Sequence, residues 1–292
     1  VEGWTGEGGA ELGTRREVPN TRDLYAVSRA LEDNHIDALL VIGGYSAYEG
    51  IYTMTTERDR YPAFRIPTVC IPASIDNNLP GSELSIGADS ALNVIVEAMD
   101  KVKESGIASR RCFVVETMGR DCGYLALMSG IAAGAERIYT NEDGISLDDL
   151  ANDVHWLRES FAHGRRLFLA VRNENASHNY TTDFIARLLE EESHGMYDVR
   201  QVVLGHMQQG GSPSPFDRLL ATRLAYRALN LIDDELAAHH DGSWFIGVSE
   251  AGMRPSSMDT MPSLIDAAHR RPREPWWLQL GIIARTVSDE VR

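Results

Sequence analysis

The chain has 292 residues, of which 43% are apolar, so it can bury one large core or two smaller ones. Its formal charge of −15 excludes a general nucleic-acid surface, because binding a polyanion requires a basic stripe that releases counterions. No run of the sequence approaches the roughly 18 uninterrupted apolar residues of a membrane span, so we expect a cytoplasmic protein with no nucleic-acid or membrane partner.

Strands and helices are predicted to alternate along the chain. Continuous apolar runs predict strands at residues 36–44, 66–71, 111–119, 166–174, 199–207 and 244–248. Apolar residues at three- and four-residue spacing predict helices at residues 23–34, 88–106, 123–135, 147–164, 181–195 and 216–239. Continuous apolar strands that alternate with amphipathic helices indicate parallel sheets with helices on both faces, the α/β class.

Two compositional features limit the interpretation of single residues. Of the 28 basic residues only Lys101 and Lys103 are lysines, so a single arginine carries little information and its position must decide its role. The cysteines are odd in number, and Cys70 and Cys112 lie in apolar strand-like runs. Buried thiols in a reducing compartment are therefore expected rather than a disulfide framework.

Polar side chains lie at or just after the carboxyl ends of four of the predicted strands. They are Asp76, Asn77 and Asn78; Glu116, Arg120 and Asp121; Arg172 and Glu174; and His206, Gln208 and Gln209. Taken singly, each fits a plain structural role, with Asp76 as a turn former, Arg120 as a loop cation and His206 as a packing residue. In open parallel sheets, however, ligands bind beyond the carboxyl ends of the strands. Four such loops together therefore predict a ligand site at that edge.

Long segments of the sequence resemble a known family. They are residues 72–100, 110–135, 172–184, 202–218 and 273–280, with the motifs "PASIDNN", "ETMGRDCG", "RNEN", "GHMQQGGSP" and "REPWWLQL". In this order they resemble 6-phosphofructokinase, most of all the C-terminal, regulatory half of the duplicated eukaryotic-type ATP-dependent enzymes. The first βαβ portion of that half, with its glycine-rich nucleotide loop, is missing. We therefore expect a fragment or processed half, with an N-terminal half fused upstream.

The resemblance implies two α/β lobes with a sugar phosphate bound between them. Residues 1–87 and 208–259 would form the larger, nucleotide-side lobe, which is partial here. Residues 88–207 and 260–292 would form the second lobe.

The resemblance also implies roles for individual residues. Asp76 would be the base that takes the proton from the sugar hydroxyl, and Arg120 would stabilise charge on the transferring phosphoryl group. Arg111 and Arg200 would reach into the pocket of a neighbouring subunit. The other sugar-phosphate contacts would be Arg16, Ser74, Ile75, Asn77, Asn78, Met118, Gly119, Glu174, His206, Met207, Gln208, Gln209 and Arg270.

The sequence departs from catalytic halves of the family at the metal and nucleotide loops. Tyr45 and Ser46 of "GGYSAYEG" stand where catalytic halves have the Asp and Gly of "GGDGS", and Asn78 replaces a second acid. Gln209 replaces an arginine, as in the regulatory pocket that binds fructose 2,6-bisphosphate. We therefore assign no metal ligand, and expect Mg²⁺ and ATP to serve the parent enzyme rather than to bind this half alone.

Two functional interpretations remain open. In one, the chain is a working part of an ATP-dependent 6-phosphofructokinase, which converts fructose 6-phosphate and ATP to fructose 1,6-bisphosphate and ADP in glycolysis. In the other, it is a non-catalytic regulatory module that binds fructose 2,6-bisphosphate as an allosteric effector. Regulatory halves usually have Ser and Gly at positions 76 and 120, where this chain has Asp and Arg. Either way the expected partners are fructose phosphates and other phosphofructokinase subunits or a fused N-terminal half.

Overall fold

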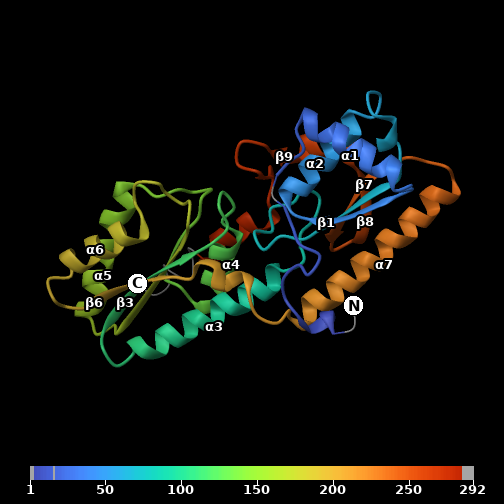
Figure 1. Ribbon diagram of the computed structural model, residues 1–292. Helices are drawn as coiled ribbons and strands as arrows, with labels where there is room; N and C mark the ends of the chain where they lie inside the picture. Colours follow the sequence, from blue (N-terminus) through green and yellow to red (C-terminus); the bar gives the residue numbers. More distant parts are fainter. Residues whose placement is uncertain (1–2, 16, 285–292) are drawn as a thin grey trace. The chain divides into compact units, whose positions relative to one another are not determined.

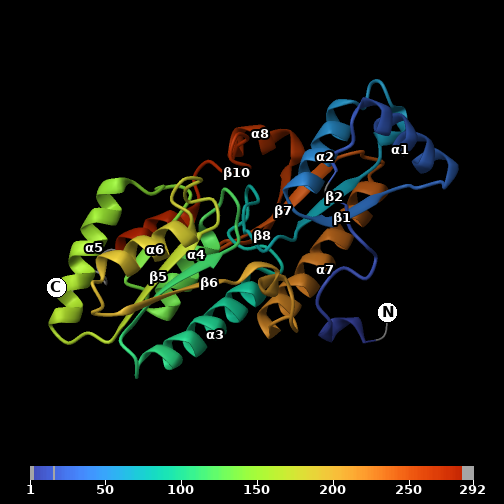
Figure 2. The same ribbon diagram turned by 60° about the vertical axis from the view of Figure 1, so that its left-hand side comes forward.

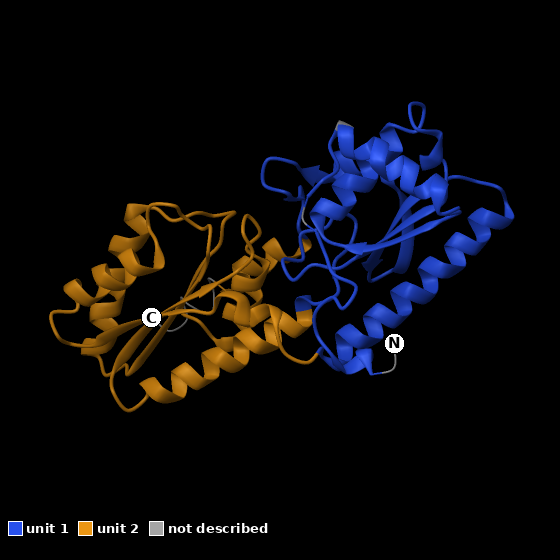
Figure 3. Cartoon of the chain, viewed as in Figure 1, with its two compact units in different colours: residues 1–88, 213–275 blue, residues 89–212, 276–292 orange. Residues whose placement is uncertain are grey.

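The computed structural model describes residues 3–15 and 17–284, and the chain divides into two compact units (Figure 3). Unit 1 comprises Val1–Ala88 and Pro213–Pro275, and unit 2 comprises Asp89–Ser212 and Trp276–Arg292. Each unit contains a four-stranded sheet made largely or wholly of parallel strands, with helices packed on it. The predicted α/β class is therefore confirmed. Among the described residues, no helix has the length and apolar character needed to cross a membrane.

The sheet of unit 1 has three parallel strands and one antiparallel edge strand. In order across the sheet these are β1 (Leu39–Gly43), β2 (Thr68–Pro72), β7 (Ser243–Ser249) and β8 (Gly252–Ser257). Strand β8 runs antiparallel to β7 and was not predicted. It contains Pro255, which lacks a backbone N–H and is tolerated only where a strand lies at the edge of a sheet.

Helices cover both faces of this sheet (Figures 1 and 2). Those concerned are α1 (Thr21–Asp33), α2 (Tyr45–Thr56) and α7 (Pro215–Ala237). Cys70 of β2 packs in the cluster that includes α1 and α2, whereas its neighbours Val69 and Ile71 pack in the cluster that includes α7. This alternation follows from the two-residue period of a strand. Helix α2, which begins directly after the Gly44 turn, was not predicted.

The remaining elements of unit 1 are short. They are η1 (Trp4–Gly6), η2 (Pro62–Phe64), η4 (Met258–Thr260), α8 (Met261–Leu264) and the antiparallel pair β9 (Ile265–Asp266) and β10 (Arg271–Pro272). Residues 260–275 thus lie in unit 1, although we predicted that they belong to the second lobe with residues 88–207. The physical reason is that Met261 and Ile265 are buried in the same apolar cluster as α1 and α2. Residues 208–212, which we predicted to lie in the larger lobe with residues 1–87, lie in unit 2.

Unit 2 is built on an entirely parallel sheet. In order across it are β4 (Arg137–Tyr139), β5 (Leu167–Asn173), β3 (Arg111–Thr117) and β6 (Asp198–Val203). The other elements are α3 (Ala88–Gly106), α4 (Tyr124–Ala133), α5 (Leu147–Ala162), α6 (Thr182–Glu192), η3 (Gly205–Gln209) and η5 (Trp276–Leu280). Cys112 and Val114 of β3 pack against α5 and α6, and α4 contacts β3, β4 and β5. The three-residue strand β4 was not predicted.

All three cysteines are buried, as predicted for Cys70 and Cys112 from the apolar runs in which they lie. Burial raises the pKa of the Cys70 and Cys112 thiols well above the ordinary range, so both stay protonated at neutral pH. They act as small apolar core residues.

A buried ion pair joins the ends of strands β3 and β5. Arg172 is only 1% exposed, and its Nη1 donates to Glu116 Oε2 at 2.6 Å and to Thr182 Oγ1 at 2.9 Å. Nη2 donates to the Ser177 carbonyl at 3.0 Å. Burial lowers the pKa of Arg172, and the Glu116 carboxylate opposes that effect. The sequence grouped Arg172 and Glu116 with the candidate site, but the buried Arg172 and the half-buried Glu116 bind each other in unit 2.

We predict that Glu116→Gln lowers the free energy of unfolding by about 3–5 kcal/mol, because it leaves a buried guanidinium without its counterion. Urea denaturation at pH 7 measures this loss. The matched control is Glu97→Gln, which removes an exposed pair with Lys101 on α3 and should cost less than about 1 kcal/mol.

A double variant separates the contribution of the ion pair to stability from the cost of leaving one buried charge unpaired. Glu116→Leu combined with Arg172→Met should recover most of the stability, because an apolar replacement of both partners leaves no unpaired charge. Equal losses for Glu116→Gln and Glu97→Gln would contradict the structural role of the pair.

Candidate functional site

The polar loop that follows β2 is folded by its own side chains. Asp76 donates its backbone N–H to Ser74 Oγ at 3.3 Å, and Asn77 adopts a left-handed conformation with φ of 50°, which asparagine tolerates well. Asn77 Nδ2 donates to the Glu83 carbonyl at 2.7 Å, and the Ser85 hydroxyl donates to Asn77 Oδ1 at 3.0 Å. Asn77 is buried and holds the loop, while Ser74, Ile75 and Asp76 are half-buried around it.

Asn78 connects this loop to the hairpin between β9 and β10. Its Nδ2 donates to the backbone carbonyl of Arg270 at 2.9 Å, across 192 positions of sequence. The Ser74 hydroxyl donates to Asn78 Oδ1 at 3.2 Å. The fold therefore brings together two of the predicted site segments within unit 1.

Arg270 is held at its guanidinium as well as at its backbone. Its Nη2 donates to Ser46 Oγ at 2.8 Å and lies 3.3 Å from Glu49 Oε2. The guanidinium carbon lies 4.7 Å from the ring centroid of Tyr45, a cation–π distance. Sequence reasoning did not find Glu49, because its partner is 221 positions away and no local pattern connects them.

The N-terminal end of α2 does not fit a magnesium ion. Tyr45 and Ser46 offer a phenol and a hydroxyl, and the carboxylate of Glu49 pairs with Arg270. Mg²⁺ requires several oxygen ligands in near-octahedral geometry, of which carboxylates are the usual protein donors. In the described part of the chain, no group of three or more His, Cys, Asp or Glu side chains could hold a metal ion. This end of α2 fits a guanidinium instead.

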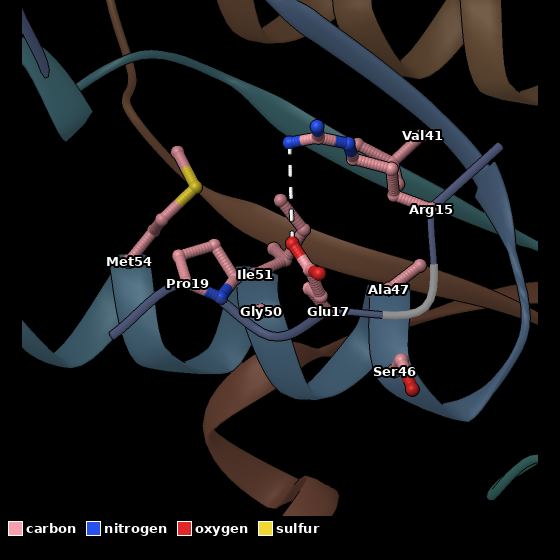
Figure 4. A pocket seen from close by; sticks show the side chains of 9 residues that line it. All are labelled: Arg15, Glu17, Pro19, Val41, Ser46, Ala47, Gly50, Ile51 and Met54. Carbon is pink, nitrogen blue, oxygen red and sulfur yellow. Dashed lines mark ion pairs between the residues drawn. The ribbon is translucent and has the colours of Figure 1, made fainter. Parts of the chain in front are cut away.

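A shallow cavity of about 180 Å³ lies beside α2 (Figure 4). Its lining residues are Arg15, Glu17, Pro19, Val41, Ser46, Ala47, Gly50, Ile51 and Met54. Its charged members, Arg15 and Glu17, form an ion pair at 3.9 Å and are both exposed, above an apolar floor. Arg16, which was predicted to contact the sugar phosphate, lies outside the described residues. No ligand is assigned to this cavity.

In unit 2, Glu174 fixes the loop that follows β3. Its Oε1 accepts the backbone N–H of Gly119 at 3.2 Å and of Arg120 at 2.8 Å. Gly119 has φ of 133°, and a Cβ there would lie 2.4 Å from the Cys122 carbonyl oxygen, so only glycine fits. Arg120 is exposed, with φ of 50°. The loop thus presents the Arg120 side chain at the surface of the unit.

The "HMQQ" turn lies against the same loop. Gln208 is 1% exposed, and its Oε1 accepts the backbone N–H of Met118 at 3.2 Å. Gln209 Nε2 lies 3.8 Å from Met118 Sδ. His206, Met207 and Gln209 are exposed, so Gln208 anchors the turn and its neighbours face outward. Unit 2 therefore gathers residues 118–120, Glu174 and 206–209 into one cluster.

Arg111 and Arg200 do not join this cluster. Arg111 is the first residue of β3, whereas residues 118–120 follow the last, and its Nη1 donates to the Ser105 carbonyl at 3.3 Å. Arg200 lies in β6 opposite Phe113, and its Nη2 is 3.8 Å from Asp198 Oδ2. Their assignment to a neighbouring subunit's pocket stays a prediction.

Comparison with known proteins identifies the family. The chain is 41% identical to the rat platelet-type ATP-dependent 6-phosphofructokinase, over 99% of the chain and 38% of the relative. It is also 41% identical to the ATP-dependent 6-phosphofructokinase of Dictyostelium discoideum, over 99% of the chain and 35% of the relative. The structure of phosphofructokinase from Saccharomyces cerevisiae matches with a TM-score of 0.94 and 33% identity, over 99% of this chain and 40% of that one.

The chain therefore spans about two fifths of the length of the relatives it matches. A family model described as Phosphofructokinase matches residues 1–232, which is most of the sequence and includes the loops after β2, β3 and β5 and the "HMQQ" turn. The chain thus belongs to the phosphofructokinase family.

Proposed function

We propose that this chain is part of an ATP-dependent 6-phosphofructokinase and that it binds a fructose phosphate. The observation that carries the proposal is the 2.9 Å hydrogen bond from Asn78 to the Arg270 carbonyl. It ties a polar loop at a strand end to a loop that carries a guanidinium. Guanidinium groups are well suited to phosphate oxygens, and amides and carboxylates to sugar hydroxyls. This chain matches about two fifths of the length of its relatives, and these relatives are named ATP-dependent 6-phosphofructokinases.

We assign the sugar hydroxyls to the cluster in unit 2. Glu174 uses Oε1 for the amides of Gly119 and Arg120, so Oε2 is the oxygen assigned to a hydroxyl. His206 and Gln209 supply further polar groups, and the exposed Arg120 supplies a cation. Gln208 and Asn77 are assigned the supporting role of holding their loops, because both are buried and bonded to backbone groups.

We further propose that this chain binds without independent phosphoryl transfer and acts as a regulatory module. The residues at the start of α2 do not suit Mg²⁺, and this supports a regulatory role. Phosphoryl transfer depends on a metal ion and on cations that stabilise the phosphates. Gln209, an amide where catalytic halves have an arginine, also supports it and favours fructose 2,6-bisphosphate as the ligand.

The second candidate is a catalytic half. The presence of Asp76 and Arg120 favours it, because a general base and a cation are the protein groups that sugar phosphorylation requires. In this role Asp76 takes the proton of the attacking sugar hydroxyl, and Arg120 balances charge on the transferring phosphoryl group. The Mg²⁺ and ATP of the reaction would then depend on residues outside this chain.

The partners are proposed on the same basis. The matched share of the relatives' length supports a second half or other phosphofructokinase subunits as partners. Arg111 and Arg200, which lie apart from the cluster in unit 2, are assigned to the pocket of such a neighbour. The proposed place of action is glycolysis in the cytoplasm.

Calorimetric titration of the full chain tests the proposal. Fructose 2,6-bisphosphate should bind, and Mg-ATP should produce no heat of binding, because the N-terminal end of α2 lacks a metal site. Fructose 6-phosphate should bind more weakly, since it offers one phosphate instead of two. Binding of fructose 6-phosphate together with Mg-ATP, followed by formation of ADP, would instead establish the catalytic candidate.

A substitution of Asp76 tests whether its carboxylate contributes to binding. Asp76→Ser should change the dissociation constant for fructose 2,6-bisphosphate by less than about threefold, because a base acts on the transition state and not on the bound ground state. The measurement is again a titration, with the melting temperature as a check on folding. A loss of affinity of tenfold or more would make Asp76 a ligand contact and contradict the prediction.

A further inference from the structure

The N-terminal part of α2 holds the side chain of Arg270. Ser46 Oγ and Glu49 Oε2 both accept from Nη2, and the ring of Tyr45 lies beneath the guanidinium. Ser46 and Glu49 are three positions apart, so they lie on the same face of the helix. We infer that Tyr45, Ser46 and Glu49 are positioning residues that orient Arg270 toward the phosphate of a bound fructose phosphate. This inference rests on the proposed function and deepens it.

An arginine that binds phosphate benefits from such a grip. A free arginine side chain has about 2 kcal/mol of rotamer entropy, part of which is lost when a ligand fixes it. In this chain part of that rotamer entropy is lost before a ligand binds. Asn78 fixes the backbone of Arg270, and α2 fixes its guanidinium. Both α2 contacts use Nη2, so Nε and Nη1 are the donors that we assign to phosphate oxygens.

The charges around the hairpin keep Arg270 attractive to an anion. The hairpin's own carboxylate, Asp266, pairs with His269, whose Nδ1 lies 2.7 Å from Asp266 Oδ2. This hydrogen bond lowers the pKa of Asp266. Glu49 is 46% exposed, so solvent screens its charge. Glu49 can therefore orient the guanidinium without cancelling its attraction for a phosphate dianion.

If Glu49 positions Arg270, its removal should change the affinity for a bisphosphate in one direction. If Glu49 only neutralises Arg270, the change should be in the opposite direction. If Glu49 only offsets the charge of Arg270, Glu49→Ala takes an anion away from the site and tightens the binding of a bisphosphate. If Glu49 positions Arg270, the same change releases the side chain and weakens binding. The sign of the effect thus distinguishes the two roles.

The experiment is a titration of the full chain with fructose 2,6-bisphosphate. Ser46→Ala combined with Glu49→Ala should raise the dissociation constant about tenfold, which corresponds to about 1.4 kcal/mol. Glu49→Gln, which keeps a hydrogen-bond acceptor, should stay within about threefold of the unchanged chain. The matched control is Glu57→Gln at the other end of α2, where Glu57 pairs with Arg60 at 3.9 Å, and it should have no effect.

A double-mutant cycle shows whether this part of α2 acts through Arg270. Arg270→Met alone should weaken binding at least as much as the Ser46 and Glu49 pair does. Adding the pair to Arg270→Met should cause no further loss, because there is no guanidinium left to orient. An additive loss would assign the pair a general structural role and overturn the inference, as would unchanged or tighter binding by the Ser46 and Glu49 pair.

The remaining outcomes separate this inference from the proposed function. If the unchanged chain binds the bisphosphate but Arg270→Met binds equally well, the inference fails and the proposed function stands. If the unchanged chain binds no fructose phosphate, the proposed function itself fails, and the inference falls with it. Thermal melting of every variant confirms that the fold is retained.

Discussion

The hydrogen bond from the Asn78 amide to the Arg270 carbonyl is the contact on which the arrangement of polar residues in unit 1 depends. It adds to the short-range bonds of the loop after β2 and to the burial of Ile265, which packs the β9–β10 hairpin in the apolar core of unit 1. With it, the hairpin is fixed beside the loop, and the Arg270 guanidinium comes within reach of Ser46 and Glu49 on α2. The Asn78 carboxamide and the Arg270 guanidinium together therefore connect three segments of unit 1.

Unit 2 uses the same physical device. Glu174 and Gln208 accept backbone N–H groups of the loop after β3, as Asn77 donates to a backbone carbonyl in unit 1. Loops that leave a buried strand must satisfy their backbone polar groups locally, and side-chain bonds to the backbone achieve this without further secondary structure. Many polar residues at the strand ends are thus structural, which leaves fewer of them to contact a ligand. The polar motifs of the sequence therefore combine scaffold and candidate contacts.

The sequence was sufficient for the regular framework because burial is periodic. The six predicted strands and six predicted helices are present, since each combines a long apolar run or stripe with a clear end. Helix α2 was missed because Gly44 provides no side-chain cap and three threonines lie near its end, at positions 53, 55 and 56. Strand β4 has only three residues, and β8 contains a proline.

The side-chain partners could be predicted only in part. Arg172 and Arg270 both lie in or near predicted motifs. The side chain of Arg172 is nevertheless 2% exposed and paired with Glu116, whereas that of Arg270 is 40% exposed. Nothing local in the sequence distinguishes them, because burial depends on which distant segments pack over each. The Glu49 contact to Arg270 spans 221 positions and likewise depends on the tertiary fold.

The pairing of Glu49 with Arg270 also bears on metal binding at the N-terminal end of α2. A divalent cation bound by Glu49 would lie close to a guanidinium that already occupies the same carboxylate. The two cations would compete for the same carboxylate oxygens, so the carboxylate can serve one of them well but not both. Because Tyr45 stacks on the guanidinium and supplies no anionic oxygen at neutral pH, the local contacts favour Arg270. Holding the guanidinium of Arg270 and holding Mg²⁺ are therefore alternative uses of this end of α2, and its residues are suited to the first.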